Sequence, residues 1–459
     1  MSMDKITKHP LRKTLDALKR ALALNGFTLY DNGEFPELEN SDINVKIFDD
    51  PAGITKPVLL QDGEYALRTQ ILPYALTKMR GHGDIFAAAA GKVFDGSDEK
   101  YPARYQLQGV IAKDMTFYDL TVLWKKIVKS FCGAAYDAAL VKTGEDVQAA
   151  DLANWGASAM KENTMAKTST WAITVSGPDM EDYTIGHIGT MTWMGLALFG
   201  RTGSDTPVFA FSMDIDDICV RYFGLKDRSE LYSNLQEFLG QYEDGTVSAS
   251  ESFEDKCRDT LRAMGYTEGF GPKIYPNGIY KKMNMIQDAW DLNNVGVQLK
   301  EPLGEGTGLP TVLTPAIEQI ISEKWAAGEK CAKAFEISHI FVPQRGGSPV
   351  EKLALSFAAY GDDVDQASFT KEVGDFLTKI GNNNHFYIPN TQAIAYKFGE
   401  CRLLLDEKMS YLGGNFGGIS EIAEGNFGIG THAYMANLEL KPLEDKAKEE
   451  YGYIAPELR

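Results

Sequence analysis

Hydrophobic residues recur at helical spacing near the start of the chain. Leu11, Leu15, Leu18 and Leu22 fall on one side of a helical projection, and Gly26 follows them. Apolar residues three or four positions apart share one side of an α-helix, and glycine is common just beyond a helix end. The pattern predicts an amphipathic helix over residues 10–26.

Further along, the pattern changes to short apolar runs separated by turn residues. Runs such as VLL and GVI between residues 45 and 110 are typical of strands, with one helix-like stretch at 73–79. Helical spacing returns over 118–131. Strands are predicted near 171–175 and 183–188.

The second half of the chain repeats this order. The polar segment QYEDGTVSASESFE at 241–254 almost lacks large apolar residues, as linkers do. After it the pattern predicts a helix at 253–264, a strand at 295–299, a helix at 314–324 and a strand at 335–342. Because a single core stops growing near about 250–300 residues, a chain of 459 residues is expected to form two domains, 1–245 and 246–459.

Composition narrows the function classes. The formal net charge is -18, from 46 basic and 64 acidic residues, which repels polyanions on average and disfavours extensive contact with tRNA. No apolar run reaches the ~18 residues of a membrane span, and the polar amino terminus lacks a signal-peptide core. A cytoplasmic location without membrane contact is expected. The five cysteines lack metal-site spacing, so no metal site is predicted from them.

Two segments carry a family resemblance in the first half. ALRTQILPYALTKM at 66–79 precedes IFAAAAGKVFDGSDEKYPARYQLQGVI at 85–111. They resemble the alpha chain of phenylalanyl-tRNA synthetase, a class II enzyme, where an LRT helix precedes the motif 2 hairpin and an FHQ-x-EG strand. DYTIGHIGTM at 182–191 is similar to the substrate-site strand of that family, and TPVFAFSMDIDDICVRYFGLKD at 206–227 stands where motif 3 belongs.

The second half resembles the catalytic-like domain of the beta chain of the same enzyme. The matching segments are VQLKEPL at 297–303, GLPTVLTPAIEQII at 308–321, AFEISHIFVP at 334–343 and SFTKEVGDFLTKIG at 368–381. The resemblance implies an α+β fold with two modules, each an antiparallel sheet flanked by helices. It also implies a homodimer, and a second module without catalysis. The anticodon-binding and editing domains of the family have no room in this length.

The resemblance places two acidic residues where the family has phosphate-binding arginines. Asp95 aligns with the motif 2 arginine and Asp217 with the motif 3 arginine. A carboxylate cannot replace a guanidinium that faces phosphate, because attraction becomes repulsion. These departures put the usual ATP chemistry in question.

Three basic residues are candidates for nucleotide binding. Arg104 aligns with the aromatic residue that stacks on adenine, and its planar guanidinium could stack on a base; an exposed arginine on a strand is the alternative. Lys92 is a candidate phosphate contact or a solvated strand lysine. Arg68 matches the arginine in the LRT segment of the family, and it is either a site residue or a buried structural arginine.

Candidate substrate contacts come from three segments. Gln106 keeps the family residue, Gln108 replaces the family glutamate that helps to hold the substrate ammonium, and Gln70 replaces part of a polar recognition pair. The glycine-rich strand adds His187, which is a pocket residue or simply structural. The full set of predicted substrate-binding residues is Gln70, Gln106, Gln108, Thr184, Gly186, His187 and Gly189.

An acidic cluster and a glycine-rich segment are better explained by secondary structure than by a ligand site. Asp214, Asp216 and Asp217 could bind a hard cation, but acids at a helix amino terminus are the commoner explanation. The glycines of LGGNFGG at 412–418 lack a following lysine and predict turns, with no phosphate loop.

Two functions follow from the sequence. One is a divergent phenylalanyl-tRNA synthetase-like ligase that binds an amino acid or small carboxylate, with ATP and Mg as candidate cofactors. The other is a non-catalytic protein that reuses the synthetase modules to bind a ligand, a protein partner or a tRNA acceptor end.

Overall fold

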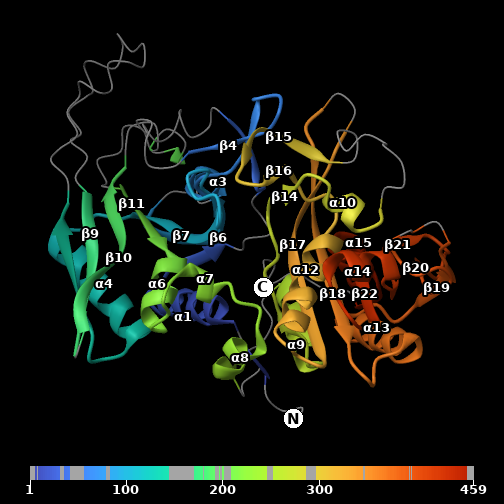
Figure 1. Ribbon diagram of the computed structural model, residues 1–459. Coiled ribbons are helices and arrows are strands. Elements are labelled where there is room, and N and C mark those ends of the chain that lie inside the picture. Colours follow the sequence, from blue (N-terminus) through green and yellow to red (C-terminus); the bar gives the residue numbers. More distant parts are fainter. Residues whose placement is uncertain are drawn as a thin grey trace. The chain divides into compact units, whose positions relative to one another are not determined.

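A computed structural model gives the fold over most of the chain (Figure 1). The residues that it describes are 6–7, 9–30, 36–41, 56–78, 83–143, 170–178, 180–191, 196, 199–200, 208–244, 252–285, 296–344, 347–391, 393 and 395–451. Two compact units divide the chain, one formed by Pro10–Leu231 and the other by Tyr232–Arg459 with Met1–His9. The predicted linker at 241–254 lies within the second unit, and its residues 245–251 are outside the described part.

A seven-stranded sheet forms the centre of the Pro10–Leu231 unit. Its strand order is β2-β6-β7-β11-β10-β9-β8, with β2 parallel to β6 and the other neighbours antiparallel. The strands are β2 (Thr28–Tyr30), β6 (Ile85–Phe94), β7 (Ala103–Ala112), β8 (Asp137–Lys142), β9 (Thr170–Gly177), β10 (Met180–Thr190) and β11 (Val208–Asp214). The unit also contains a small sheet of three strands, β3 (Leu38–Asn40), β5 (Tyr65–Leu67) and β4 (Val58–Leu59).

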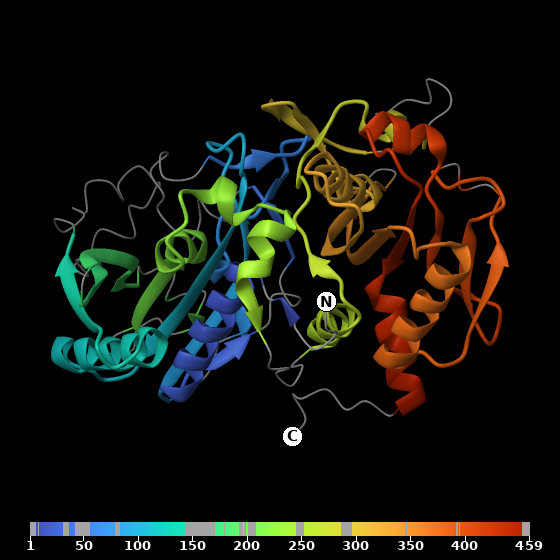
Figure 2. The same cartoon turned by 60° about the horizontal axis from the view of Figure 1, so that its bottom comes forward.

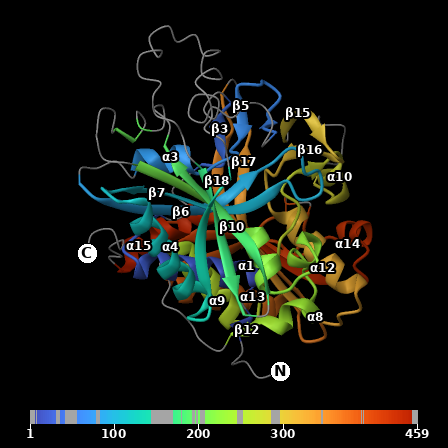
Figure 3. The ribbon, with the colours of Figure 1, turned by 90° about the vertical axis from the view of Figure 1, so that its left-hand side faces the viewer.

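Helices cover the two faces of this sheet differently. On one face Trp124 packs its ring against Phe211, and Arg12 lies over the ring of Tyr105. The opposite face receives Ile71 and its neighbours on α3 (Figures 1 and 3). The helices are α1 (Pro10–Leu24), α3 (Leu72–Lys78), α4 (Phe117–Cys132), α6 (Ile215–Tyr222) and α7 (Arg228–Leu231), and Figure 2 shows α1 and α4 side by side.

The Tyr232–Arg459 unit is built on a second seven-stranded sheet, of order β13-β17-β18-β22-β21-β20-β19. Its strands are β13 (Thr267–Glu268), β17 (Ala332–Val342), β18 (Val350–Tyr360), β19 (His385–Pro389), β20 (Arg402–Asp406), β21 (Tyr411–Gly418) and β22 (Ala433–Glu439). A small sheet of β14 (Tyr275–Pro276), β16 (Gly306–Leu309) and β15 (Val297–Leu303) lies in the same unit, which also pairs β1 (Ile6–Thr7) with β12 (Glu243–Asp244).

Two apolar clusters enclose this second sheet. One buries Phe335, Phe357 and Phe416 under three helices, and the other buries Ala334, Ala358 and Met435 on the opposite face. The helices of the unit are α8 (Gln236–Leu239), α9 (Phe253–Ala263), α10 (Ile279–Lys282), α12 (Thr314–Ala326), α13 (Gln366–Ile380), α14 (Glu421–Phe427) and α15 (Leu440–Tyr451), with a 3-10 turn at Gly240–Tyr242.

The two large sheets share one topology. In both, the strands taken in chain order occupy the same places, and the first strand is the parallel one. The pairing also starts alike: Ala112 lies opposite Ile85 and Val208, while Tyr360 lies opposite Ala332 and Ala433. Positions in the two units can therefore be matched by counting along the paired strands.

The structure confirms the predicted α+β class with two sheet-rich modules. The helices expected at 10–26, 118–131, 253–264 and 314–324 are present as α1, α4, α9 and α12. The turns expected at 412–418 are wrong, because these residues belong to β21. None of the helices in the described residues is long and apolar enough to cross a membrane.

Candidate functional site

A row of polar side chains crosses the middle of the first sheet. Gln108 lies opposite Ser212, and Ser212 lies opposite His187. Residues directly opposite in neighbouring antiparallel strands place their side chains on the same face. The three side chains therefore share the face that α3 covers in part, on the opposite side of the sheet from α1 and α4.

The same face carries a second row nearer the strand ends. Asp214 lies opposite Gln106, and Gln106 lies opposite Gly91. Arg104, two residues before Gln106 on β7, belongs to this face because side chains alternate along a strand. We call this surface the polar sheet face and define it by Arg104, Gln106, Gln108, His187, Ser212 and Asp214.

The Gln108 side chain forms three hydrogen bonds to the scaffold. Its Oε1 accepts hydrogen bonds from the backbone N–H groups of Ile71 and Leu72, at 2.9 and 2.7 Å, at the start of α3. Its Nε2 donates to Ser212 Oγ at 3.2 Å. Gln108 is 4% exposed, and its contacts hold the start of α3 against the sheet.

Arg104 is paired with carboxylates on both sides. Its Nη2 lies 2.6 Å from Asp95 Oδ2, and its Nη1 lies 3.6 Å from Asp214 Oδ2. Asp95 also accepts hydrogen bonds from the backbone N–H and the hydroxyl of Ser97. Burial opposes ionisation of Asp95, but the Ser97 bonds and the Arg104 guanidinium outweigh it and lower its pKa.

A second arginine at this site was missed by sequence reasoning. Arg228 Nη2 lies 3.0 Å from Asp217 Oδ1 and 3.5 Å from Asp214 Oδ2, and its Nη1 lies 3.5 Å from Asp98 Oδ2. Its position one residue beyond the motif 3-like segment was the only signal. The two acidic residues at the predicted arginine positions are thus each paired with an arginine, Asp95 with Arg104 and Asp217 with Arg228.

Asp214 joins these two pairs. It caps the start of α6 by accepting from the backbone N–H of Asp217, at 3.1 Å. Burial is the main cause that raises the pKa of Asp214, and the negative charge of Asp217 adds to it, whereas Arg228 and Arg104 act in the opposite direction. The network of two arginines and the carboxylates of Asp95, Asp98, Asp214 and Asp217 has a formal excess of negative charge.

Two buried polar atoms on this face have no hydrogen-bond partner in the described residues. They are Nε of Arg104, a donor, and Oε1 of Gln106, an acceptor. A buried polar atom without a partner costs about 1–3 kcal/mol. Because Gln106 lies opposite Asp214, an unused acceptor and a carboxylate lie side by side on this face.

Two of the predicted nucleotide contacts lie elsewhere. Lys92 is opposite Tyr105, so its side chain is on the face that α1 and α4 cover. There its Nζ forms a buried ion pair with Glu37 Oε1 at 2.9 Å. Arg68 is fully buried and donates from Nε to the carbonyl of Lys92, at 2.7 Å, and from Nη1 to the carbonyl of Pro36. These contacts are those of structural residues.

The residues predicted from the glycine-rich strand divide between the two faces. A register shift in β10 falls between Thr184 and Gly186. Thr184, His187 and Gly189 share the polar sheet face, whereas Gly186 faces the other way, where an added Cβ would lie 2.9 Å from Met213 Cγ. Gln70 directly precedes the residues that Gln108 caps, so it lies beside the polar sheet face.

The acidic residues at 214, 216 and 217 lie at the start of a helix. Asp216 is fully buried and accepts a hydrogen bond from the backbone N–H of Tyr105 at 3.0 Å, on the face that α1 and α4 cover. Within the described residues, no group of three or more histidine, cysteine or acidic side chains is arranged to hold a metal ion. The acids instead begin α6, as the helix interpretation expected.

Comparisons with known proteins find similarity to both chains of one enzyme. Residues 240–440 match the family model described as the phenylalanyl tRNA synthetase beta chain CLM domain. The chain is 25% identical over 253 residues to the phenylalanine–tRNA ligase alpha subunit of Fusobacterium nucleatum, an alignment that spans 51% of this chain and 69% of that protein. It is 33% identical over 135 residues to the alpha subunit of Clostridium perfringens, spanning 28% and 39%.

The beta-chain match covers the segments of the second half that suggested the resemblance. The beta-chain match coincides with most of the Tyr232–Arg459 unit, and similarity to alpha subunits is found in the same polypeptide. That Asp95 and Asp217 stand where the family has arginines stays a prediction from the resemblance. The chain is therefore a phenylalanyl-tRNA synthetase-like protein that combines alpha-chain and beta-chain likeness, consistent with a divergent paralogue.

Proposed function

We propose that the Pro10–Leu231 unit binds an amino acid or a closely related small acid on the polar sheet face and does not form an adenylate. One observation carries the proposal: Asp95 and Asp217, which stand at the arginine positions that the resemblance implies, are each paired with an arginine of this chain. A guanidinium shared with a carboxylate is a weak site for a triphosphate, because its charge is already balanced.

The polar sheet face offers groups suited to an α-amino acid. An ammonium group needs hydrogen-bond acceptors, and Gln106 Oε1 and the Asp214 carboxylate lie side by side. One oxygen of a ligand carboxyl group needs a single N–H donor, which a charge-balanced guanidinium can still supply, and the partnerless Nε of Arg104 lies two residues from Gln106 on the same face. A ligand that carries both groups would satisfy both buried atoms at once.

The second candidate function is an ATP-dependent ligase, with Mg as its metal. It is favoured by the activity in the names of the similar alpha subunits and by two arginines, Arg104 and Arg228, at one edge of the face. In this case Mg²⁺ would have to offset the carboxylates that now neutralise the arginines. A homodimer and contact with a tRNA acceptor end remain proposals of the resemblance, and the net charge of -18 disfavours the latter.

Calorimetric titration and thermal shift of the full chain test the choice. Amino acids and small acids are expected to bind and raise the melting temperature, because a ligand that binds only the folded state stabilises it. Mg-ATP is expected to give no amino-acid-dependent pyrophosphate exchange. Such exchange would overturn the non-catalytic proposal in favour of the ligase, and failure of every amino acid and small acid to bind would overturn ligand binding.

Two variants locate the site. Asp214→Asn and Gln106→Leu are each expected to weaken the bound amino acid about tenfold or more, since hydrogen bonds to charged groups contribute about 1.5–3 kcal/mol. The matched control is Glu439→Gln, at the position of the second sheet that corresponds to Asp214, and it should bind as the wild type does. Equal loss in the control would place the ligand elsewhere.

A further inference from the structure

The Arg104 guanidinium meets carboxylates of the protein through both of its terminal nitrogens. Nη2 lies 2.6 Å from Asp95 Oδ2, and Nη1 lies 3.6 Å from Asp214 Oδ2. Its Nε is buried and has no hydrogen-bond partner in the described residues. A guanidinium binds a carboxylate most strongly through two parallel N–H groups. Because its terminal nitrogens already face carboxylates, Arg104 offers a ligand the single N–H group of Nε, which suits one carbonyl oxygen.

Carboxylates outnumber guanidinium groups around this donor. Ion pairs of 2.6–3.6 Å join two guanidinium groups to four carboxylates, those of Arg104, Arg228, Asp95, Asp98, Asp214 and Asp217. Like charges repel strongly in a partly buried site, where salt and water screen them less than at the surface. A ligand carboxylate at Nε would be a fifth negative group in this network. An uncharged carbonyl accepts the same hydrogen bond and adds no negative charge.

Hydrogen-bond acceptors are in surplus on this part of the face. Gln106 Oε1 is buried without a partner in the described residues, and Gln106 lies opposite Asp214. The side chains of Ser212 and Asp214 are partly exposed and His187 is exposed, so this part of the face is in contact with solvent. An ammonium group brings three N–H donors and a primary amide brings two more, whereas a carboxylate brings none. A ligand with an ammonium group and an amide therefore supplies the donors that the face lacks.

We propose that the polar sheet face prefers an α-ammonium group joined to an uncharged carbonyl, the chemistry shared by an α-amino amide and the first residue of a peptide, over the free amino acid. The inference rests on the function proposed above and specifies the ligand class of that same face. The ammonium group donates to Gln106 Oε1 and to the Asp214 carboxylate, and the carbonyl oxygen accepts from Arg104 Nε. The amide N–H groups supply further donors beside the carboxylates.

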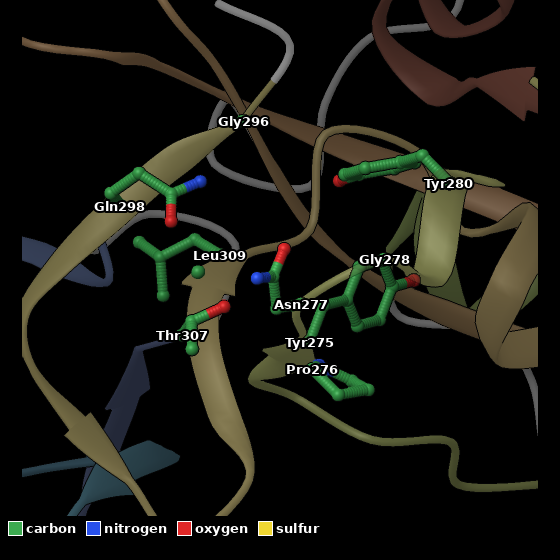
Figure 4. A pocket seen from close by; sticks show the side chains of 10 residues that line it. Tyr275, Pro276, Asn277, Gly278, Tyr280, Gly296, Gln298, Thr307 and Leu309 are labelled. Carbon is green, nitrogen blue, oxygen red and sulfur yellow. The ribbon is translucent and has the colours of Figure 1, made fainter. Parts of the chain in front are cut away.

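The hollow over the small sheet of the Tyr232–Arg459 unit is too small for such a ligand. Figure 4 shows its walls, which come from β14, β15, β16 and the turn before α10. It has room for about one water molecule. Tyr275 and Tyr280 are buried in the core beside it, so neither offers a free ring face. Gln298→Leu in this hollow is the counterpart of Gln106→Leu on the polar sheet face, and it should leave binding unchanged.

Calorimetric titration of the full chain with each of the twenty amino acids and with its α-amide tests the preference. At about pH 6 both forms carry an ammonium group, since the α-amino pKa is about 7.7–8.0. For every amino acid that binds, the amide is expected to bind about tenfold tighter. If an amino acid binds and its amide does not bind tighter, the inference is wrong while the proposed function stands. If no amino acid and no amide binds, both are wrong.

A dipeptide amide that begins with the same residue identifies the source of the ligand. Affinity equal to or above that of the simple amide indicates the amino end of a peptide, because the second residue then finds room. Weaker binding indicates a small amide. Both outcomes keep the preference for an uncharged carbonyl.

Two variants test whether charge causes the preference. Asp95→Asn removes a carboxylate from Arg104, so the free amino acid should gain affinity and the advantage of the amide should fall at least threefold. The matched control is Asp84→Asn, because Asp84 is 58% exposed and precedes β6, whereas Asp95 follows it. The ten residues of β6 span about 33 Å, well beyond the Debye length of about 10 Å, so the control should keep the wild-type ratio.

Asp217→Asn repeats the test if Asp95→Asn fails to fold. Its side chain is 63% exposed, so the fold should tolerate the change, and it removes one carboxylate from the same network. The advantage of the amide should fall in the same direction by a smaller factor. A wild-type ratio in every folded variant of Asp95 and Asp217 would overturn the inference.

Discussion

Each large sheet has an ion pair at the matching position, but the surroundings of the two pairs differ. Counted from the strand pairs that begin each sheet, Arg104 and Asp214 correspond to Lys352 and Glu439. The Arg104–Asp214 pair spans 3.6 Å with side chains 18% and 23% exposed, and the Lys352–Glu439 pair spans 2.9 Å at 39% and 27%. One topology therefore holds a charged network in the first unit and a solvated pair in the second.

The residues beside these pairs differ in the same sense. In the first unit the neighbouring row is Gln108, Ser212 and His187, and Asp95, Asp98, Asp217 and Arg228 extend the charges. In the second unit the corresponding row is neutral and consists of Ser356, Asn437 and Asn415. The comparison indicates that the fold fixes where polar groups meet on the sheet, whereas side-chain identity decides whether the face can bind charge.

The largest expected effect comes from breaking the ion pair in each sheet. Arg104→Ala leaves Asp95 and Asp214 short of a counter-charge in a mostly buried site, so it should destabilise the first unit by about 3 kcal/mol. Lys352→Ala removes the more exposed partner and should cost the second unit less than about 1 kcal/mol. Hydrogen exchange of β7 and β18 amides measures the two effects separately. Equal costs would mean that the two pairs are not differently embedded.

Local sequence signals predicted much of the fold. The spacing of Leu11, Leu15, Leu18 and Leu22 sufficed for α1, and Gly26 ends that helix with a φ of +87°, which glycine adopts readily. The repeated order of elements indicated two related modules. Both signals depend on contacts within one element or on the order of elements along the chain.

The signals that failed depend on long-range contacts. The glycines at 412–418 suggest turns, yet they form β21 because neighbouring segments approach closely: a Cβ on Gly414 would lie 2.3 Å from Leu438 Cδ2, and one on Gly417 would lie 2.4 Å from the Glu400 carbonyl oxygen. Gln108 was expected at the ligand, but its amide caps α3, a contact between residues 36 and 37 positions apart. Spacing along the chain contains no information on either contact.

The second largest effect is expected at the Gln108 side-chain amide, which holds α3 against the first sheet. Gln108→Ala leaves the N–H groups of Ile71 and Leu72 without their acceptor and should cost about 2 kcal/mol. The matching change in the second sheet, Ser356→Ala, removes a single bond to the Ala436 carbonyl and should cost less than about 1 kcal/mol. Chemical denaturation followed by hydrogen exchange of α3 and β18 gives both values.

Gln108→Glu sharpens this prediction. A carboxylate can still accept from both N–H groups and is favoured at a helix start, so stability should stay within about 0.5 kcal/mol of the wild type. The same change adds a negative charge to the polar sheet face, of which Gln108 is a member. A loss as large as that of Gln108→Ala would mean that burying the carboxylate, or losing the Nε2 bond to Ser212, outweighs the two retained N–H bonds.

A smaller effect is expected in the helix that covers the second sheet. Glu318 on α12 is fully buried, and neither carboxylate oxygen has a hydrogen-bond partner in the described residues. Burial is the main cause that raises the pKa of Glu318 well above its usual value, and Glu424 adds to it. Glu318→Leu should therefore stabilise the unit at neutral pH by about 1–2 kcal/mol.

The sign of the pH dependence follows from that raised pKa. The folded state holds the Glu318 proton after the unfolded state has lost it, so this residue makes the wild type less stable as the pH rises past the unfolded pKa. The gain from Glu318→Leu should grow from acidic to neutral pH in denaturant titrations. Glu421→Leu, whose side chain is 79% exposed, is the control and should show no such growth. A gain that is the same at every pH would contradict the prediction.

The smallest effect belongs to a histidine held between two carboxylates in the second unit. His432 Nδ1 lies 2.7 Å from Glu424 Oε1, and Nε2 lies 3.3 Å from Glu400 Oε2. The hydrogen bond to Glu424 is the main cause that raises the pKa of His432; burial opposes it, and Glu400 adds to the rise. The protonated ring can donate to both carboxylates, which come from the turn before β20 and from α14.

His432→Gln should therefore destabilise the second unit by about 1 kcal/mol or less at acidic pH, since the ring is partly exposed. Because the folded pKa is raised, the contribution is complete below the unfolded pKa and is lost as the pH rises through the folded one. Wild type and variant should converge at alkaline pH in urea titrations. Glu421→Gln removes an acid of the same helix without touching His432, so it should reproduce neither the loss nor the convergence. A constant difference at all pH values would mean that His432 acts through packing, and the second sheet would then lack the charge-dependent contact predicted here.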